Sequence, residues 1–234
     1  KELLDYAQKV NNLTYEFKTQ FNNDEIKGYV HIVVPDSLCE SMLIRNYQDF
    51  YRHNPYISLK FSTADTQEMF EMLSENRADL MLTLDTHAYH KDYKIYKEEP
   101  IKIHFVTSIN NPLIHKKSIS INDLLNEPFI LTEKSMGYRK VFEEELAKRS
   151  IELEPILEIG RTDIITQLVI QTNAISFLPD FITEKDVREG KIAYLDVIDF
   201  DVEIWKQLIC HKNKWLSKPL EVLLDYIQEH EFTL

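Results

Sequence analysis

The chain has 234 residues, of which 44% are hydrophobic, and its 27 basic and 39 acidic side chains give a formal net charge of −12. This length allows one large domain or two of about 100 residues each. The acidic excess repels a polyanion, and no apolar run approaches the roughly 18 residues of a membrane span, so this stretch is predicted to bind neither nucleic acid nor membrane. Cys39 and Cys210 form no CxxC motif, which indicates neither a disulfide framework nor a metal site.

The first part of the chain predicts an amphipathic helix. Its apolar residues follow one another at three- and four-residue steps, as in a coiled-coil seam: Leu3, Tyr6, Val10, Leu13 and Phe17. A second copy of the chain or the chain's own body could cover this seam, and both interpretations stay open. The start KELLDYAQKV lacks an apolar signal region and does not begin with Met. We therefore expect a cytoplasmic location and a further domain upstream.

Strands and helices alternate in the next part of the chain. YVHIVVP, ISLKF and ADLMLTL are predicted strands, and the first is followed by a helix that carries Leu38, Met42, Leu43 and Phe50. A second helix carries Met69, Met72 and Leu73. Strands that alternate with helices predict a parallel sheet whose three strand ends share one edge.

A second set of strands and helices begins near Ser108. IKIHFVTS, PFIL, EPILEIG and AISFLP are predicted strands, and PFIL leads into a helix within LTEKSMGYRKVFEEEL. EPILEIG leads into a helix at Thr162, VEIWKQLICHK is a long strand, and a helix over residues 219–227 follows it. Two similar sets of this kind predict two lobes that bind a ligand beyond their strand ends.

Hydroxyl groups recur where these strands pass into helices. A helix start carries unpaired N–H groups and a positive field, which suit an anion, and Thr132 lies at one such start. Alternatively, Thr132 or Ser135 only caps the helix. Arg161 could grip a carboxylate through two hydrogen bonds, or pair with a neighbouring acidic side chain. The candidates for that ion pair are Glu133, Glu158 and Asp163. Lys134 and Arg139 are expected to be solvated.

The motifs KGYVHIVVPDSL, HNPYISLKF, NRADLML, LTEKSMGYRKVFEEEL, EIGRTDIITQLVIQ and AISFLP, in this order, resemble the effector-binding domain of LysR-type transcriptional regulators. The resemblance covers essentially the whole chain. It implies an α/β fold of two Rossmann-like lobes, of the periplasmic-binding-protein type 2, joined by two crossing strands and preceded by a linker helix. Residues 1–25 would be the linker and dimerisation helix, residues 26–107 plus 212–234 lobe one, and residues 108–211 lobe two.

The family's effector positions fall on the helix starts described above. The resemblance therefore implies hydrogen bonds to a small effector from Ser37, Thr63, Thr132 and Thr162, to which Arg161 adds a cation that points to an acidic ligand. It also implies a homodimer or homotetramer that contacts DNA only through an upstream winged helix-turn-helix domain. The family usually has glycines before the strand ISFLP. This chain has Thr172, Asn173 and Ala174 there, and Asn173 is expected to adopt the left-handed conformation in place of glycine.

Enzyme functions find little support in the sequence. GxGxxG, P-loop and GxSxG motifs are absent, so no cofactor and no catalytic residue is predicted, although a Ser/His/Asp group assembled by the fold stays open. Asp85, His87, His90 and Asp92 could collect a metal, but a polar loop is the commoner case and no metal site is predicted. The predicted function is effector sensing in a transcriptional regulator. A free-standing solute-binding protein of the same fold and an enzyme of the prephenate dehydratase type are the alternatives.

Overall fold

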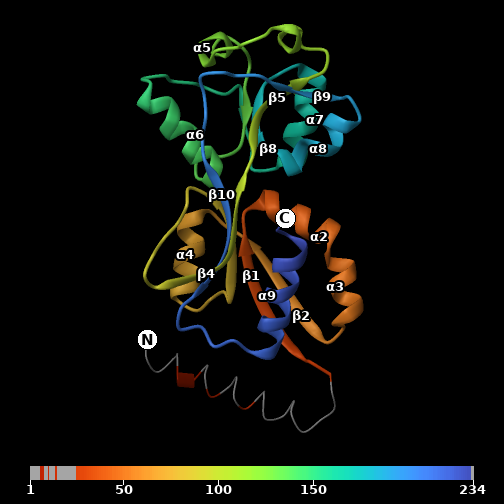
Figure 1. Ribbon diagram of the computed structural model, residues 1–234, viewed down its shortest axis with the longest axis vertical. Helices are drawn as coiled ribbons and strands as arrows, with labels where there is room; N and C mark the ends of the chain where they lie inside the picture. The colour runs from red at the N-terminus through yellow and green to blue at the C-terminus, as the bar shows by residue number, and fades with distance from the viewer. Residues whose placement is uncertain (1–5, 8–9, 11–13, 15–24, 233–234) are drawn as a thin grey trace. The chain divides into compact units, whose positions relative to one another are not determined.

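The computed structural model describes residues 6, 7, 10, 14 and 25–232 (Figure 1). Within the predicted N-terminal seam, Tyr6 and Val10 are helical and are 66% and 61% exposed. Leu3, Leu13 and Phe17 lie outside the described residues. Whether a second copy of the chain covers this seam stays a prediction.

The chain divides into two compact α/β units. The first unit contains the chain as far as Thr83, then Ala88–Glu99, then the chain from Gln207 onward. The second contains Leu84–His87 and Pro100–Lys206. The predicted lobe boundaries, 26–107 plus 212–234 and 108–211, stay a prediction.

The first unit is built on a five-stranded sheet with the order β2-β1-β3-β10-β4. The strands are β1 (Gly28–Val34), β2 (Ile57–Thr63), β3 (Leu80–Asp85), β4 (Tyr93–Ile101) and β10 (Ile204–His211). β1 pairs in parallel with both β2 and β3, with Val34 opposite Thr63 and Val33 opposite Met81. The predicted parallel arrangement, with three strand ends on one edge, is confirmed.

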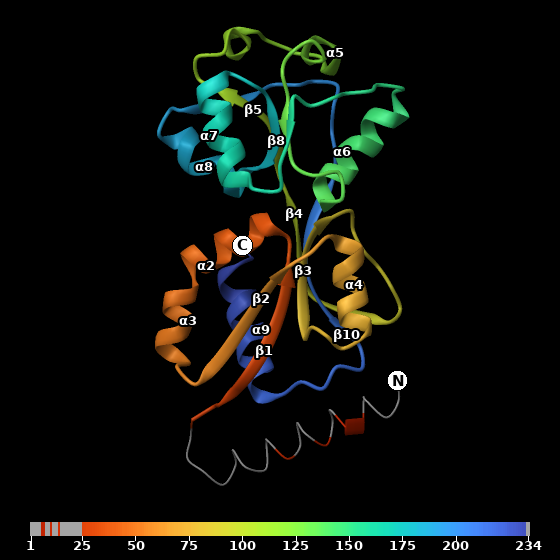
Figure 2. The same ribbon diagram turned by 180° about the vertical axis from the view of Figure 1, so that it is seen from behind.

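Helices cover both faces of this sheet. They are α2 (Asp36–Arg45), α3 (Tyr47–His53), α4 (Thr66–Ser74) and α9 (Lys218–His230). α4 lies on one face and α2, α3 and α9 lie on the other (Figures 1 and 2). The core under α4 consists of its methionines and Leu73 packed against the sheet residues Val33, Met81 and Ile209. These layers follow from the apolar spacing of the helices and from strands that are buried on both faces.

The prediction of a single helix over residues 38–50 is wrong, because the chain forms two helices that meet at Asn46. The backbone of Asn46 leaves the helical region, with φ −121° and ψ −20°. α9 holds it there, since the Tyr226 hydroxyl donates to the Asn46 carbonyl oxygen at 2.9 Å and the Asn46 side-chain amide donates to Glu231. These partners lie 180 and 185 residues away in sequence. The helix break at Asn46 therefore cannot be predicted from the apolar spacing of residues 38–50.

The second unit combines antiparallel and parallel strands. They are β5 (Ile103–Ser108), β6 (Ile130–Leu131), β7 (Leu157–Glu158), β8 (Ser176–Pro179) and β9 (Ile192–Leu195). β5 pairs antiparallel with β8 and β9, whereas β6 pairs in parallel with β7 and reaches β8 through a parallel bridge between Phe129 and Ile175. The helices are the 3-10 helix η1 (Pro112–His115), α5 (Ile121–Leu124), α6 (Gly137–Lys148), α7 (Thr162–Thr172) and α8 (Asp180–Arg188).

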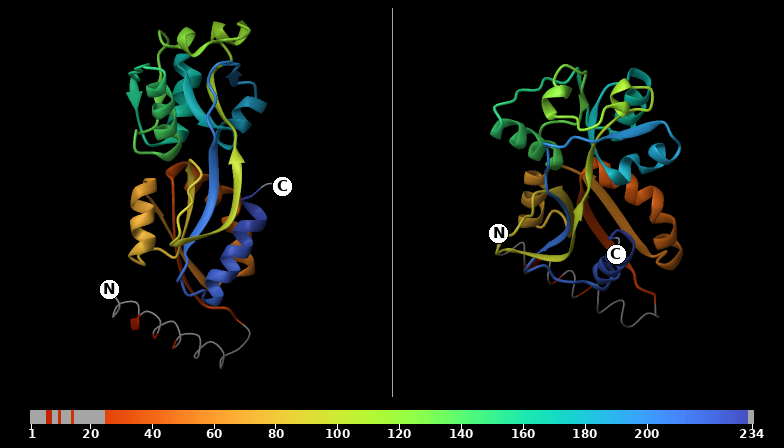
Figure 3. Two further views of the ribbon diagram at one scale, coloured as in Figure 1. Left: turned by 60° about the vertical axis from the view of Figure 1, so that its left-hand side comes forward. Right: turned by 45° about the horizontal axis from the view of Figure 1, so that its top comes forward.

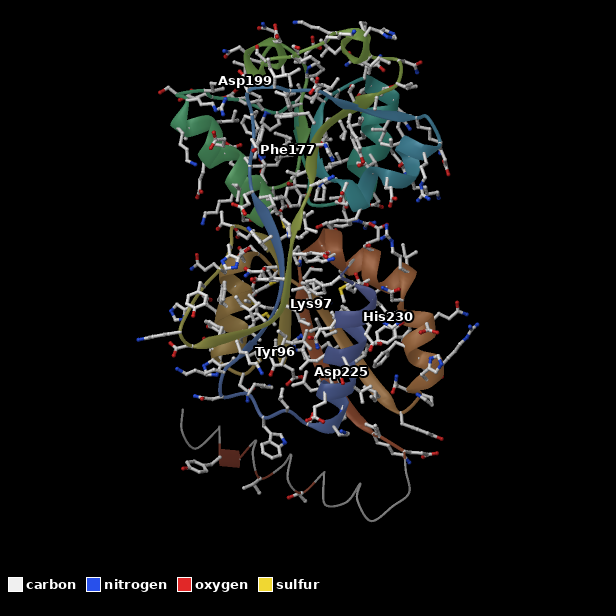
Figure 4. The ribbon with its side chains drawn as sticks, in the orientation of Figure 1. Tyr96, Lys97, Phe177, Asp199, Asp225 and His230 are labelled. Atoms are coloured by element: carbon white, nitrogen blue, oxygen red, sulfur yellow. The ribbon has the colours of Figure 1, made fainter. Side chains whose placement is uncertain are left out.

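Alternating side chains of the second unit separate into two cores. Phe105, Leu131 and Phe177 pack on the side of α6, while their chain neighbours Val106, Ile130 and Leu178 pack on the side of α7 and α8. The first core is aromatic, with the ring of Phe177 (labelled in Figure 4) 4.9 Å from that of Phe105 between centroids. β5, β6 and β8 therefore bury both of their faces between helices, as strands of a doubly wound fold do.

β4 and β10 join the two units, and the last two residues of β3, Leu84 and Asp85, also belong to the second unit. β4 and β10 are neighbours in the sheet, each contributes residues to both units, and they run side by side (Figure 3). They are the two joining strands that the predicted fold class implies. At the end of α7, Asn173 has φ 56° and ψ 18°, so the expected left-handed conformation is confirmed. In the part of the chain that the structure describes, no helix has both the length and the apolar character to cross a bilayer.

Candidate ligand site

The helix starts differ in how they are capped. Asp65 caps α4, because its carboxylate accepts a hydrogen bond from the Glu68 N–H at 2.9 Å. The N-cap residues of α2, α6 and α7 are Pro35, Met136 and Arg161, and none makes a side-chain capping hydrogen bond. The alternative that Thr132 or Ser135 only caps α6 is therefore wrong, because the N-cap residue is Met136 and the Thr132 hydroxyl has no hydrogen-bond partner among the described residues. Three of these four starts therefore lack a capping hydrogen bond from the N-cap side chain, and at α7 the Asp163 carboxylate instead accepts backbone N–H groups of the first turn.

Ser37 and Thr63 come together at one edge of the first unit. Val34 at the end of β1 lies opposite Thr63, and Ser37 lies in the first turn of the helix that follows β1. Ser37 is buried and Thr63 is exposed. Near the end of the adjacent strand β3, Thr83 is fully buried, and its hydroxyl has no hydrogen-bond partner among the described residues. Sequence reasoning missed Thr83, although a single hydroxyl within the apolar run LMLTL was a visible signal.

Thr132, Arg161 and Thr162 come together in the second unit. β6 and β7 are paired with Leu131 opposite Glu158, and the Ile159 N–H donates to the Leu131 carbonyl oxygen at 3.1 Å. The residues that follow these strands are therefore neighbours, and α7 begins at Thr162 directly after them. The structure thus places the three predicted residues at one pair of strand ends.

The Thr132 hydroxyl is buried without a partner. Ile130 packs in the core on the side of α7, and Thr132, two residues further along the same direction, faces that side too. The residue is 3% exposed, and its Oγ1 has no hydrogen-bond partner within the described part of the chain. A buried hydroxyl left in this state costs about 1 to 3 kcal/mol. Such a group calls for a partner that the chain itself does not supply, such as a ligand or an ordered water.

Arg161 forms an ion pair with Asp163, which is one of the two roles predicted for it. Its Nε and Nη2 donate to the two carboxylate oxygens of Asp163 at 2.9 and 2.7 Å, and its side chain is 57% exposed. These hydrogen bonds are the main cause of the lowered pKa of the Asp163 carboxyl group. The pair holds the guanidinium at the start of α7. Contact between Arg161 and an effector stays a prediction.

Arg139 was expected to be solvated, and that expectation is wrong. The side chain is 1% exposed, and its Nη1 donates to the Thr132 carbonyl oxygen at 2.8 Å. Nη1 also lies 3.4 Å from a carboxylate oxygen of Glu158, and Nη2 donates to Glu143. Arg139 therefore connects the end of β6, strand β7 and helix α6. The only signal in the sequence was the acidic residue four positions further along the helix.

Gly137 opens α6 at a point where the backbone leaves no room for a side chain. A Cβ atom on Gly137 would collide with the carbonyl oxygen of Leu84, which also belongs to the second unit. Only glycine permits this approach.

The four residues considered for a metal site, Asp85, His87, His90 and Asp92, contact protein groups. The ring of His87 meets that of Trp205 edge-on with centroids 5.0 Å apart, and the Asp85 carboxylate accepts a hydrogen bond from the Thr86 N–H at 2.7 Å. His90 Nδ1 lies 3.8 Å from a carboxylate oxygen of Asp92. Across the described residues, no three His, Cys, Asp or Glu side chains gather in a way that could hold a metal ion.

Open α/β folds, in which helices cover both faces of a sheet, bind their ligands beyond the carboxyl ends of their strands. A family model described as the LysR substrate binding domain matches residues 23–231. The chain therefore belongs to the LysR substrate-binding domain family, and the predicted resemblance is confirmed.

Characterised and uncharacterised regulators are similar to this chain. It is 28% identical over 227 residues to the uncharacterized HTH-type transcriptional regulator YwqM of Bacillus subtilis, with 96% of this chain and 77% of YwqM covered. It is 29% identical over 189 residues to the HTH-type transcriptional activator CmpR of Synechocystis, with 78% of this chain and 60% of CmpR covered. The relatives are thus longer than the matched region.

Solved structures share the fold. The regulatory domain of CcmR from Synechocystis, solved in complex with 2-PG, aligns with a TM-score of 0.72 and 20% identity over 87% of this chain and 97% of that chain. The effector-binding domain of QuiR, solved in complex with shikimate, aligns with a TM-score of 0.69 and 16% identity over 88% of this chain and 99% of that chain. The predicted periplasmic-binding-protein type 2 fold is confirmed.

Proposed function

We propose that this chain is the effector-sensing part of a LysR-type transcriptional regulator and that it binds a small acidic molecule. Family membership supports the first statement. The buried, unpartnered hydroxyl of Thr132 next to Arg161 and the start of α7 carries the second, because a hydroxyl, a guanidinium and helix N–H groups together suit a carboxylate. Ser37, Thr63 and Thr162 complete the set of proposed effector-binding residues.

The ligands named for the solved relatives agree with this chemistry. QuiR was solved with shikimate, the anion of a carboxylic acid, and CcmR with 2-PG. Binding of a related small anion would shift the population between two conformations of the domain, and so couple effector concentration to DNA binding.

The remaining parts of the proposal concern the whole protein. The chain covers only part of its relatives, which are named as HTH-type regulators, so the DNA contact is assigned to a further domain. A cytoplasmic location follows from that role. The names of the relatives favour regulation over catalysis. A solute-binding protein or a dehydratase-type enzyme of the same fold would be recognised by export of the protein or by turnover of the bound acid.

A thermal-shift screen of small carboxylic and phosphorylated acids tests the proposed function. A ligand present at 100 times its dissociation constant should stabilise the folded chain by about 2.7 kcal/mol, which shifts the melting temperature measurably. The matched uncharged amides should have little effect. If only neutral compounds raise the melting temperature, the acidic effector is contradicted.

We also predict that the chain forms homodimers or homotetramers. The first unit exposes large apolar side chains on α2, α3 and the segment before the edge strand β2: Leu43, Ile44, Tyr47, Tyr51 and Tyr56. Ile44 is 75% exposed, and Tyr47 and Tyr51 stack with centroids 6.2 Å apart. Such a patch is typical of a protein interface.

Sedimentation velocity at micromolar concentrations measures this self-association. Wild type should sediment as a dimer or larger, and Ile44→Glu combined with Tyr51→Glu should shift it toward monomer, because charge in an apolar interface is costly. Tyr89→Glu is the matched control, since Tyr89 is 87% exposed and lies outside this patch. A strictly monomeric wild type would contradict the prediction.

A further inference from the structure

A cavity of about 300 Å³ lies in the first unit, and its lining includes none of the hydroxyl-bearing residues Ser37, Thr63 and Thr83. It is lined by Phe70 of α4, by Tyr93 and Ile95 of β4, by Ile209 of β10 and by the segment 88–91. The chain between β3 and β4 loops outward on the side of α4 in Figures 1 and 2. This volume is within the range of small-molecule sites.

The inner side of the cavity is apolar and aromatic. Ile209 is 1% exposed and belongs to the core under α4, while Phe70 and Ile95 are partly buried and pack against that core. The Tyr93 hydroxyl donates to the Phe70 carbonyl oxygen at 3.1 Å, and the two rings meet edge-on with centroids 4.9 Å apart. The wall is therefore fixed by a hydrogen bond as well as by packing.

The segment that covers the cavity is held at both ends. The Ala88 N–H donates to the Gln207 side-chain oxygen at 2.8 Å. The Tyr93 N–H donates to the His90 carbonyl oxygen at 3.0 Å, and the ammonium of Lys212 donates to the Lys91 carbonyl oxygen at 3.2 Å. These contacts join the segment to two strands, so the cavity is formed before any ligand arrives.

The solvent side of the cavity is polar and basic. His90 and Lys91 are exposed, and Lys91 makes no ion pair with any described residue. The nearby carboxylate of Asp92 is occupied by Lys212, at 2.7 Å from its ammonium. This hydrogen bond is the main cause of the lowered pKa of the Asp92 carboxyl group, and the ammonium of Lys91 makes a smaller contribution. No acidic side chain lines the cavity itself.

We propose that this cavity binds a small aromatic monocarboxylate. The ring would lie against Phe70, Tyr93 and Ile95, and the carboxylate would point to solvent between Lys91 and His90. A flat ring suits edge-to-face aromatic walls, and an anion suits an ammonium without an acidic partner. None of the five proposed effector-binding residues takes part. The two sites can therefore be tested separately.

Phenylacetate is the probe for this site. We expect it to shift the δ1-methyl NMR signals of Ile95 and Ile209 in the full chain, saturably, at concentrations up to about 10 mM, as for a weak single-ring ligand. The uncharged isostere 2-phenylacetamide should bind about tenfold more weakly, because it loses the charge-assisted contact. Shifts that are absent or that never saturate would overturn the proposal.

Three variants distinguish the contribution of the ligand's ring to binding from the contribution of its carboxylate. Ala88→Leu places atoms inside the cavity and should abolish the shifts. Lys91→Ala should weaken phenylacetate about tenfold without affecting phenylacetamide. Lys94→Ala is the matched control, because it removes the same charge from a neighbouring residue whose ammonium lies 4.2 Å from the Tyr96 ring centroid and does not line the cavity.

The exposed position of Lys91 keeps the test valid even if Ala88→Leu fails to fold. Equal weakening by Lys91→Ala and Lys94→Ala would mean a general charge effect and would overturn the assigned carboxylate contact. Binding that survives in a folded Ala88→Leu variant would place phenylacetate elsewhere and overturn the site.

Discussion

Replacing Arg139 with methionine should lower the free energy of unfolding of the second unit by about 3 kcal/mol. Methionine fills much of the space of the arginine stem, so the loss comes from hydrogen bonds and charge. The Thr132 carbonyl oxygen would lose its donor, and the carboxylates of Glu143 and Glu158 would lose their cation. The effect stays at the lower end of the range for buried pairs, because both carboxylates are partly exposed and can be rehydrated.

Urea unfolding monitored by Trp205 fluorescence measures this loss. Trp205 belongs to the second unit and Trp215 to the first, so a Trp215→Phe background leaves Trp205, in the joining strand β10, as the tryptophan reporter. Lys140→Met is the matched control, since the Lys140 side chain is 63% exposed and its ammonium lies 3.9 Å from a carboxylate oxygen of Glu144. That control should change stability by less than about 0.5 kcal/mol. Equal midpoints for wild type and Arg139→Met would show that the buried guanidinium contributes nothing net.

The arrangement of β1, β2 and β3 could be predicted because β1 and β3 carry nearly continuous apolar runs and β2 alternates apolar with polar residues. β4, in contrast, was missed, and its sequence YKIYKEEPI explains why. Its side chains alternate between solvent and partial burial, so no apolar run marks it as a strand. α8 and β9 were missed as well. Elements of this kind are defined by the partners they pair with, which a single sequence does not reveal.

The positions of the candidate site residues could be predicted from the sequence, but their hydrogen-bond partners and burial could not. Hydroxyls at helix starts are visible in sequence, so Thr132 and Thr162 could be named. The lack of a partner for the Thr132 hydroxyl depends on the packing of α7, and the burial of Arg139 depends on Glu158, 19 residues away along the chain. Both features depend on tertiary contacts, which the sequence alone does not reveal. The same limit applies to Asn46, whose helix break is held by contacts to α9.

Replacing Arg161 with alanine should weaken an acidic effector by about 10- to 100-fold, because one or two charge-assisted hydrogen bonds contribute about 1.5 to 3 kcal/mol each. The melting temperature should hardly change. The pair with Asp163 is largely exposed on the arginine side, and such pairs contribute about 0 to 1 kcal/mol to stability. Calorimetric titration with the acid found by thermal shift, together with melting curves, measures both quantities.

Arg188→Ala is the control for Arg161→Ala. Arg188 lies in the same unit, is 73% exposed and also pairs weakly with an acidic side chain, Glu184, at 3.9 Å. The loss of charge is the same, but the residue lies on α8, far along the chain from the strand ends of β6 and β7. Equal weakening by both variants would indicate a long-range charge effect and would remove Arg161 from the site.

Asp163→Asn should act in the opposite direction and strengthen the acidic effector. Nε and Nη2 of Arg161 donate to the Asp163 carboxylate, so an incoming carboxylate must compete with that side chain for them. The substitution removes the competing charge and also removes an anion from the first turn of α7, where a ligand anion would otherwise be repelled. An increase in affinity that disappears when Arg161→Ala is added would establish that the two residues act through one guanidinium. Unchanged affinity in Asp163→Asn, with an intact fold, would instead assign Arg161 a purely structural ion pair.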